Sequence, residues 1–99
     1  MRIVAVTACP TGIAHTYMAA EQLQKVAKTL GHQIKVETQG AMGIENELSA
    51  KDIREADIAI FAVDIDVEQR DRFSGKKIVE VPVQEAIRNP HAVFEKLRL

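Results

Sequence analysis

The 99-residue sequence has one cysteine, no tryptophan and one tyrosine, and each shortage excludes a class of structure or chemistry. A single cysteine can form neither an internal disulfide nor the cysteine pair of a dithiol redox site. With so few aromatic side chains, a base-stacking surface for nucleic acid is excluded. The chain must therefore fold on an ordinary hydrophobic core, which its length permits.

An excess of charge of one sign is also lacking. The 13 Lys and Arg residues face 14 Asp and Glu residues, for a formal net charge of −1. This balance gives no electrostatic case for nucleic acid binding. No apolar run is long enough to span a bilayer, and the N-terminus lacks the features of a secretory signal. We interpret residues 1–99 as a single cytoplasmic domain, without direct membrane insertion and monomeric.

Short apolar runs alternate with segments of helical spacing along the chain. The predicted strands are residues 2–8, 33–38, 58–63 and 78–81, and the predicted helices are residues 13–30, 50–56, 82–88 and 91–99. Such alternation is typical of a parallel sheet with right-handed crossovers. We therefore expect a three-layer α/β fold: an open sheet of four parallel strands in the order 2-1-3-4, with helices on both faces.

The second predicted strand and the segment after it have a distinct pattern. Ile34 and Val36 alternate with Lys35 and Glu37, which predicts an edge strand with one face in water. Residues 39–46 contain two glycines and are expected to form a loop. Ser49 and Asp52 have the spacing of a capping box, which predicts a helix starting at Ala50.

The single cysteine, Cys9, falls where the first strand ends and the first long helix begins. In the order 2-1-3-4, the chain diverges after strand one, and this creates a crevice at the carboxyl ends of strands one and three. Unpaired backbone N–H groups and the helix dipole make a helix N-terminus favourable for anions and for a thiolate. The position predicts a nucleophilic or phosphate-carrying cysteine rather than a buried small hydrophobe.

Several kinds of chemistry compete for this loop. Metal binding has little support, because Cys9 and His15 have no second cluster of ligands. Cysteine phosphatases use a similar loop but need an arginine close after the cysteine, and none occurs in residues 9–30. A carrier that holds a phosphoryl group, a low-activity cysteine phosphatase and a non-enzymatic anion sensor remain as alternatives, and the missing arginine favours the carrier.

The run from Thr7 to Ala20, TACPTGIAHTYMAA, resembles the signature of fructose-type enzyme IIB components of the bacterial phosphoenolpyruvate-dependent sugar phosphotransferase system. Two further segments are similar to that family. One is VETQG at residues 36–40 with Gly43 and Asn46. The other runs from Ala56-Asp57 to Asp64, followed by Arg72-Phe73 and Gly75-Lys76. The resemblance covers essentially the whole chain.

This resemblance implies a phosphotransferase without a cofactor or metal. A phosphohistidine of the IIA component would donate its phosphoryl group to Cys9. Phospho-Cys9 would then pass it to a sugar, fructose or a fructose-like one, bound in the membrane-embedded IIC component. The domain would dock on the inner face of the membrane through IIC. The expected phosphoryl-binding loop comprises Pro10, Thr11, Gly12, Ile13, Ala14, His15 and Thr16.

Other residues near the expected crevice have two interpretations each. His15 could lie beside the phosphoryl group as a donor or base, or orient the loop by hydrogen bonding. Gly40 and Gly43 are expected to shape the crevice wall, and Asp64 to cap a helix or to contact a partner. The Met1 start and the predicted terminal helix favour a free-standing component over a piece of a longer protein.

Overall fold

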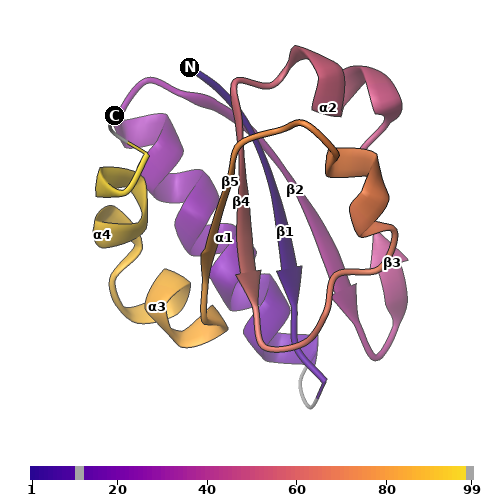
Figure 1. Ribbon diagram of the computed structural model, residues 1–99. Helices are drawn as coiled ribbons and strands as arrows, with labels where there is room; N and C mark the ends of the chain where they lie inside the picture. Colours follow the sequence, from indigo (N-terminus) through magenta and orange to yellow (C-terminus); the bar gives the residue numbers. More distant parts are fainter. Residues whose placement is uncertain (11–12, 98–99) are drawn as a thin grey trace.

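The computed structural model describes residues 1–10 and 13–97. Its sheet has the strand order β3-β2-β1-β4-β5 (Figure 1). The elements in chain order are β1 (Arg2–Ala8), α1 (Ile13–Thr29), β2 (Gln33–Gly40), β3 (Gly43–Glu45), α2 (Ala50–Glu55), β4 (Ile58–Val63), the 3-10 helix η1 (Arg70–Phe73), β5 (Ile78–Val81), α3 (Val83–Arg88) and α4 (Pro90–Glu95).

The four longer strands confirm the predicted order. β2, β1, β4 and β5 lie side by side and parallel, with Ile3 opposite both Ile34 of β2 and Ile58 of β4. β4 is buried along its whole length, and β1 is buried except at Arg2. Continuously apolar strands of this kind belong in the middle of a sheet that is covered on both faces.

The prediction of a purely parallel, four-stranded sheet is wrong. β3 pairs antiparallel with β2 in a hairpin, so the sheet is mixed and has a fifth strand within residues 39–46, where a loop was expected. Gly40 lies opposite Gly43, and only two residues connect them. Gly43 has a φ of 87°, which glycine adopts without steric cost. Gly43 and Ile44 lack an alternating apolar pattern, so no strand could be predicted here.

The prediction that β2 is an edge strand with a wet face is also wrong at its carboxyl half. β3 covers that edge, and Glu37 is 0% exposed although it alternates with apolar residues. Lys35, nearer the start of the strand, is exposed as expected. The alternation described the first half of β2 correctly, whereas the burial of Glu37 depends on partners from distant segments.

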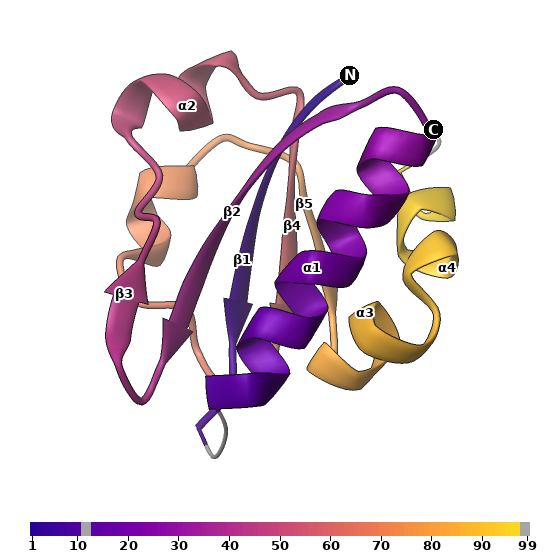
Figure 2. The same ribbon diagram turned by 180° about the vertical axis from the view of Figure 1, so that it is seen from behind.

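Helices cover both faces of the sheet, as predicted. α1, α3 and α4 pack on one face through an apolar cluster that includes Leu23, Ala86 and Phe94 (Figure 2). α2 and η1 cover part of the other face, where Ile53 and Phe73 pack with apolar side chains of β1 and β4. Leu23, Ala86 and Phe73 are almost completely buried. The result is a three-layer arrangement.

The helix boundaries agree with the sequence within a residue or two, except at the last helix. α2 begins at the predicted capping box, in which Asp52 N–H donates to Ser49 Oγ (3.0 Å) and Ser49 N–H donates to Asp52 (3.0 Å). α4 ends at Glu95 rather than Leu99, and residues 98–99 lie outside the described part. Within residues 1–10 and 13–97, no helix is both long and apolar enough to cross a membrane.

Candidate functional site

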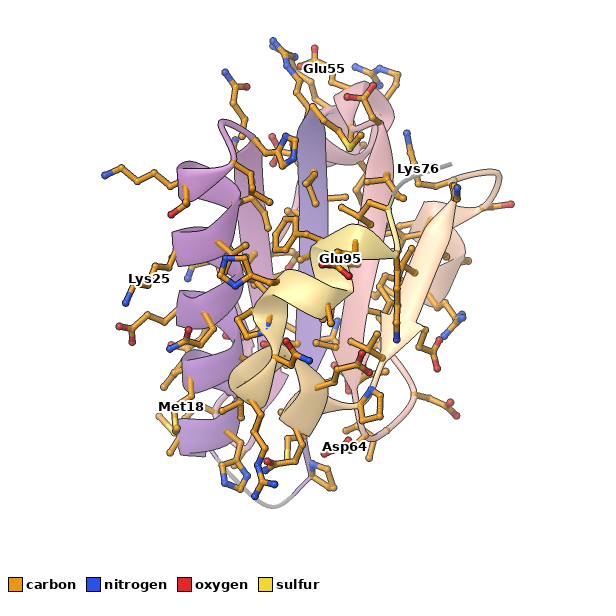
Figure 3. The ribbon with its side chains drawn as sticks, turned by 90° about the vertical axis from the view of Figure 1, so that its left-hand side faces the viewer. Met18, Lys25, Glu55, Asp64, Lys76 and Glu95 are labelled. Atoms are coloured by element: carbon orange, nitrogen blue, oxygen red, sulfur yellow. The ribbon has the colours of Figure 1, made fainter. Side chains whose placement is uncertain are left out.

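Three segments of the chain meet at the edge of the sheet where the parallel strands end. Ala8 lies opposite Gln39 of β2 on one side and Val63 of β4 on the other. Figure 3 places Met18 and Asp64 at this end of the molecule and Glu55 and Lys76 at the opposite end. The residues that follow β1, β2 and β4 therefore gather at one edge, as the predicted crevice requires.

Cys9 follows β1 directly and is 3% exposed. It belongs to the apolar cluster beneath α1, so its burial is that of the small hydrophobe that the sequence interpretation had set aside, although it also adjoins a pocket. The backbone around it is anchored, because Asp64 N–H donates to the carbonyl of Ala8 (2.9 Å). Cys9 is therefore held at the end of the central strand, between the segment after β4 and the start of α1.

The predicted phosphoryl-binding loop is described only in part. Thr11 and Gly12 lie outside the described residues, as does the side chain of Ile13. Pro10 is exposed beside Cys9, and Ala14 and His15 are exposed in the first turn of α1. Thr16 is buried, and its carbonyl accepts a hydrogen bond from the Thr7 hydroxyl (3.1 Å). That bond ties the start of α1 to β1, close to Cys9.

A pocket of about 240 Å³ adjoins the cysteine. Its lining consists of Cys9, Pro10, Gln39, Gly40, Ala41, Gly43, Ile65, Asp66 and Glu68. The structure thus brings Gly40 and Gly43 together with Cys9, as expected for a crevice wall. Among the described residues that line it there is no Lys or Arg, and the titratable side chains besides the thiol are two carboxylates.

Asp64 is not among the residues that line this pocket. Its carboxylate accepts a hydrogen bond from Val83 N–H (3.2 Å), at the start of α3. The carboxylate thus satisfies one backbone N–H group at the start of α3, whose N-cap residue is Pro82. Asp66 and Glu68, from the same polar segment, lie at the pocket instead.

The buried carboxylate of Glu37 and the partly buried guanidinium of Arg72 form an ion pair on the face of the sheet opposite α1. Arg72 donates to both carboxylate oxygens of Glu37, at 3.0 and 2.9 Å. Leu48 N–H and the Gln39 amide donate to the same carboxylate, at 2.9 and 2.7 Å. Four N–H groups of the protein thus donate to the buried carboxylate of Glu37 in place of water.

The pKa of Glu37 reflects this environment. Burial alone would raise the pKa of the carboxyl group, but the hydrogen bonds from Arg72, Leu48 and Gln39 outweigh it and hold the pKa below its ordinary value. The hydrogen bond to Glu37 correspondingly raises the pKa of Arg72. Both groups therefore remain charged inside the fold.

Sequence reasoning missed this network, although a signal for it was present. Glu37 and Gln39 belong to the VETQG segment and Arg72 to the Arg72-Phe73 pair, and both segments carried the family resemblance. Strand alternation, however, placed Glu37 in solvent. To predict the ion pair, the two segments that are similar to the family would have had to be placed in contact, although Glu37 and Arg72 are 35 positions apart.

Large apolar side chains are exposed around the cysteine end of the molecule. We call Tyr17, Met18, Met42 and Ile65 the apolar rim. Tyr17 and Met18 lie in the first turns of α1, Met42 in the β2–β3 turn and Ile65 in the pocket wall. The Tyr17 hydroxyl donates to the carboxylate of Glu45 and so links α1 to β3. Exposed apolar groups beside a candidate reactive group are typical of a docking surface.

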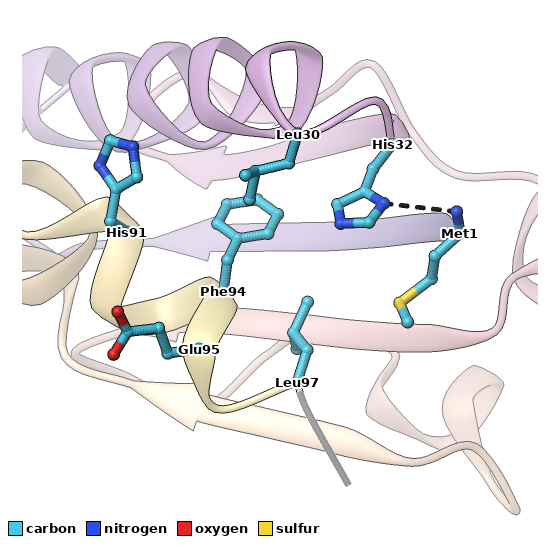
Figure 4. Close-up of a pocket in the computed structure, with 7 residues that line it drawn as sticks. All are labelled: Met1, Leu30, His32, His91, Phe94, Glu95 and Leu97. Carbon is cyan, nitrogen blue, oxygen red and sulfur yellow. Dashed lines mark hydrogen bonds between the residues drawn. The ribbon is translucent and has the colours of Figure 1, made fainter.

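A second, larger pocket lies far from Cys9. It has a volume of about 480 Å³ and includes His32, His91 and Phe94 (Figure 4). The His32 ring stacks on Phe94 with 6.2 Å between centroids, and its Nδ1 lies 3.3 Å from the amino nitrogen of Met1. This pocket adjoins Met1, just before β1, so it lies at the edge of the sheet opposite Cys9. Among the described residues, no cluster of His, Cys, Asp and Glu could hold a metal ion.

Comparison with known proteins identifies the class of this site. Residues 4–96 match the family model described as the lactose/cellobiose-specific IIB subunit of the phosphotransferase system. The chain therefore belongs to the IIB family of the sugar phosphotransferase system, whose members act as phosphotransferases.

Individual relatives identify the branch of that family. The chain is 50% identical over 96 residues to the fructose-like EIIB component 2 of Escherichia coli K12, covering 97% of this chain and 91% of the relative. It is 53% identical over 95 residues to the fructose-specific EIIABC component of Bacillus subtilis 168, covering 96% of this chain but 15% of that longer protein. The chain is a fructose-type IIB domain.

A solved structure agrees with this assignment. The solution structure of the enzyme IIB subunit from Escherichia coli K12 superimposes with a TM-score of 0.91 at 42% identity. The match covers 97% of this chain and 89% of that one. The mixed sheet found here is thus consistent with the fold of a solved IIB subunit.

Proposed function

We propose that Cys9 carries a phosphoryl group from a phosphohistidine of a IIA component to a sugar bound by a IIC component. The observation that carries this proposal is the position of the only cysteine. It lies at the end of the central strand, at the start of a 17-residue helix and beside a pocket. Fructose or a fructose-like sugar is the proposed acceptor, since the relatives are named for it.

Two displacements at phosphorus make up the proposed cycle. The thiolate of Cys9 attacks the phosphoryl group, the S–P bond forms and the N–P bond breaks. The imidazole of the IIA histidine leaves with the electron pair and takes up a proton. A sugar hydroxyl then attacks, the O–P bond forms, the S–P bond breaks and the thiolate is regenerated while the hydroxyl proton is released. Positioning and charge stabilisation dominate such steps.

The start of α1 is suited to stabilise the phosphoryl charge. The backbone N–H groups of residues 11–16 are proposed to bind the phosphoryl group, and the macrodipole of α1 adds positive potential. Thr11 and Thr16 are proposed to add hydroxyl donors, and His15 either a donor or a loop-orienting bond. These residues form the proposed phosphoryl-binding loop, with Gly40 and Gly43 in the wall of the crevice.

The pocket composition favours transfer over hydrolysis. A cysteine phosphatase stabilises its transition state with a nearby cation. The described lining of the Cys9 pocket provides none, and Arg72 is engaged by Glu37. A carrier needs less intrinsic stabilisation, because each partner can bring charge of its own to the phosphoryl group.

The proposed partners are IIA and IIC components, docking in turn on the apolar rim. The name of the Bacillus subtilis relative places A, B and C components in one protein. We propose that residues 1–99 act as one such B domain, monomeric and on the cytoplasmic side of the membrane, where IIC is reached. Asp64, which accepts a hydrogen bond at the start of α3, is proposed to support this surface rather than the chemistry.

Mass spectrometry tests the proposal directly. The protein is mixed with a phosphorylated fructose-type IIA component, and the phosphoryl group is mapped to a residue. We expect a phosphoryl group on Cys9, its loss when sugar and IIC-containing membranes are added, and no label in Cys9→Ala. Absence of label on Cys9, or label elsewhere that survives Cys9→Ala, would disprove the carrier. Turnover of a phosphomonoester without IIA would instead support the phosphatase.

A further inference from the structure

We infer that Gln39 is a positioning residue that fixes the wall of the Cys9 pocket, and that the Glu37–Arg72 ion pair helps to fix Gln39. This inference rests on the proposed function for its effect on phosphoryl transfer. Its structural part stands on hydrogen bonds of the described residues. The wall in question is the segment of residues 64–69, which follows β4 and contributes Ile65, Asp66 and Glu68 to the pocket.

Gln39 holds this wall by its backbone. Its side-chain oxygen accepts from Glu68 N–H (2.8 Å), and its amide nitrogen donates to the carbonyl of Glu68 (3.2 Å). One side chain thus satisfies both backbone groups of a single loop residue, as a neighbouring strand would. Gln39 is itself buried and lines the pocket, so the clamp lies at the site rather than behind it.

Glu37 reinforces the orientation of the Gln39 amide that the two bonds to Glu68 require. The carboxylate can only accept, so the Gln39 nitrogen must face it, which occurs at 2.7 Å. The oxygen of Gln39 is then directed toward Glu68 N–H. Rotation of the amide by half a turn would set donor against donor and acceptor against acceptor at Glu68, and Glu37 adds a third mismatch, because its carboxylate would then face the Gln39 oxygen.

Arg72 links Glu37 to the last residue of the wall. Its terminal nitrogens bind Glu37, and its Nε donates to the carbonyl of Gln69 (3.0 Å), the last residue of the wall. At the other end, Asp64 N–H is bonded to Ala8, next to Cys9. The wall is therefore anchored at its start, near its end and at its last residue, with Ile65 and Asp66 spanning the pocket between these anchors.

A positioning role explains why this ion pair is present at all. An ion pair with a buried carboxylate offers little net stability over apolar side chains of similar size, and we attribute the presence of this one to the geometry that it imposes. Phosphoryl transfer depends on that geometry, because a displacement of 1 Å in a reacting assembly can reduce the rate about 100-fold. Glu37 and Arg72 thus act on Cys9 through Gln39 and the wall.

Gln39→Met tests the inference, since methionine keeps the length of the side chain and removes its hydrogen bonds. We expect the Glu68 amide to exchange its hydrogen at least about tenfold faster, while amides in the middle of β1 keep their rates. Alkylation of Cys9 by iodoacetamide should also accelerate about tenfold, because a loosened wall exposes the thiol. Single-turnover transfer from phosphorylated IIA should slow about 10- to 100-fold per folded molecule.

Ile53→Ala is the matched control. Ile53 is buried in the apolar cluster that also holds Val67 of the wall, but it lies in α2 and does not line the Cys9 pocket. This substitution should destabilise the whole fold and yet leave transfer per folded molecule within about twofold of the wild type. A loss in Ile53→Ala equal to that in Gln39→Met would mean that transfer follows general stability, and the positioning role would be disproved.

The structural measurements, amide exchange and alkylation, and the transfer measurement separate this inference from the proposed function. Faster Glu68 exchange and faster alkylation with unchanged transfer would show a purely structural clamp and overturn the inference. Unchanged exchange and alkylation would overturn it as well, whatever Cys9 carries. If wild-type Cys9 accepts no phosphoryl group, the proposed function fails, and with it the catalytic part of the inference.

Arg72→Lys provides a second variant should Gln39→Met fail to fold. Lysine retains the charge but has neither the two parallel donors nor the Nε contact with Gln69. The same three measurements should change in the same direction and to a smaller extent. No change in any of them in a folded Arg72→Lys protein would contradict the inference.

Discussion

The guanidinium of Arg72 donates two parallel hydrogen bonds to Glu37, whose carboxylate has no exposure to solvent. The two residues lie on η1 and β2 and are 35 positions apart. This pair joins the sheet to the segment that covers its second face, and its removal has consequences for stability and for pH dependence.

Removing one partner of this pair should be costly. In Arg72→Met the carboxylate of Glu37 stays buried without its counter-charge, and we expect a loss of about 3–5 kcal/mol in the free energy of unfolding. Replacing both residues, as Glu37→Met with Arg72→Met, removes the uncompensated charge and should cost less than Arg72→Met alone. Urea unfolding of the three proteins measures this; a double variant less stable than the single one would contradict it.

The pair should also make the protein sensitive to acid. Since the fold lowers the pKa of Glu37, the unfolded state binds more protons between the two pKa values. The contribution of ionised Glu37 to the free energy of unfolding is fully present above the ordinary pKa of 4.5. It is lost as the pH falls through the lower pKa of the folded state. Urea unfolding at about pH 7 and about pH 3 should show a steeper decline for the wild type than for Glu37→Gln.

Other carboxylates contribute equally to both proteins in that comparison. The hydrogen bond from Lys35, with those from Ser49, lowers the pKa of Asp52 to about 2. This carboxylate bonds Lys35 and Ser49 rather than Glu37 and is present in both proteins, so its contribution cancels in the difference. Parallel acid profiles for wild type and Glu37→Gln would therefore show that Glu37 does not govern the decline.

The two glycines of the β2–β3 hairpin should respond differently to substitution. Gly43 has a φ of 87°, so Gly43→Ala forces an L-residue into a strained conformation and should cost about 1–2 kcal/mol. At Gly40, an added Cβ would lie 3.6 Å from Thr16 Oγ1, which is ordinary contact, so Gly40→Ala should be nearly neutral for stability. Thermal unfolding distinguishes the two, and equal losses would refute this explanation.

The apolar rim can be tested with a pair of substitutions at the two ends of α1. Met18 is 47% exposed in its second turn, and Leu30 is 46% exposed just after its last residue. We expect Met18→Ser to raise the concentration of phosphorylated IIA that half-saturates transfer about tenfold, because buried apolar contact is lost at the interface. Leu30→Ser removes similar exposed area away from Cys9 and should have no effect. Equal effects would exclude a localised docking surface.

Tyr17 offers a spectroscopic test of the contact between α1 and β3. The hydrogen bond to Glu45 raises the pKa of the Tyr17 hydroxyl above 10.0, because it stabilises the protonated form. As the chain has one tyrosine and no tryptophan, the near-ultraviolet absorbance of the phenolate reports this group alone. Glu45→Gln should shift the titration to lower pH. An unchanged midpoint would mean that the carboxylate does not contact Tyr17 in solution.

Much of the fold was predictable because it depends on local patterns. The apolar runs at Arg2–Ala8 and Ile58–Val63 predicted the buried central strands, and the capping box at Ser49 predicted the start of α2. β3 was not predictable, since three residues with two polar or glycine positions carry no periodicity. Glu37 was misplaced because alternation reports the face of a strand but not what later covers that face.

The candidate site also has a part that was predictable from the sequence and a part that was not. Cys9 could be proposed from sequence alone, because a thiol between an apolar strand and a helix falls at an anion-binding position in any parallel α/β fold. Gln39, Glu68 and the other residues of the pocket wall could not, since only the tertiary structure brings the ends of β1, β2 and β4 together. The sequence identified Cys9 as the candidate reactive group. The fold determined the wall that faces it, because that wall is held by hydrogen bonds between segments about 30 residues apart.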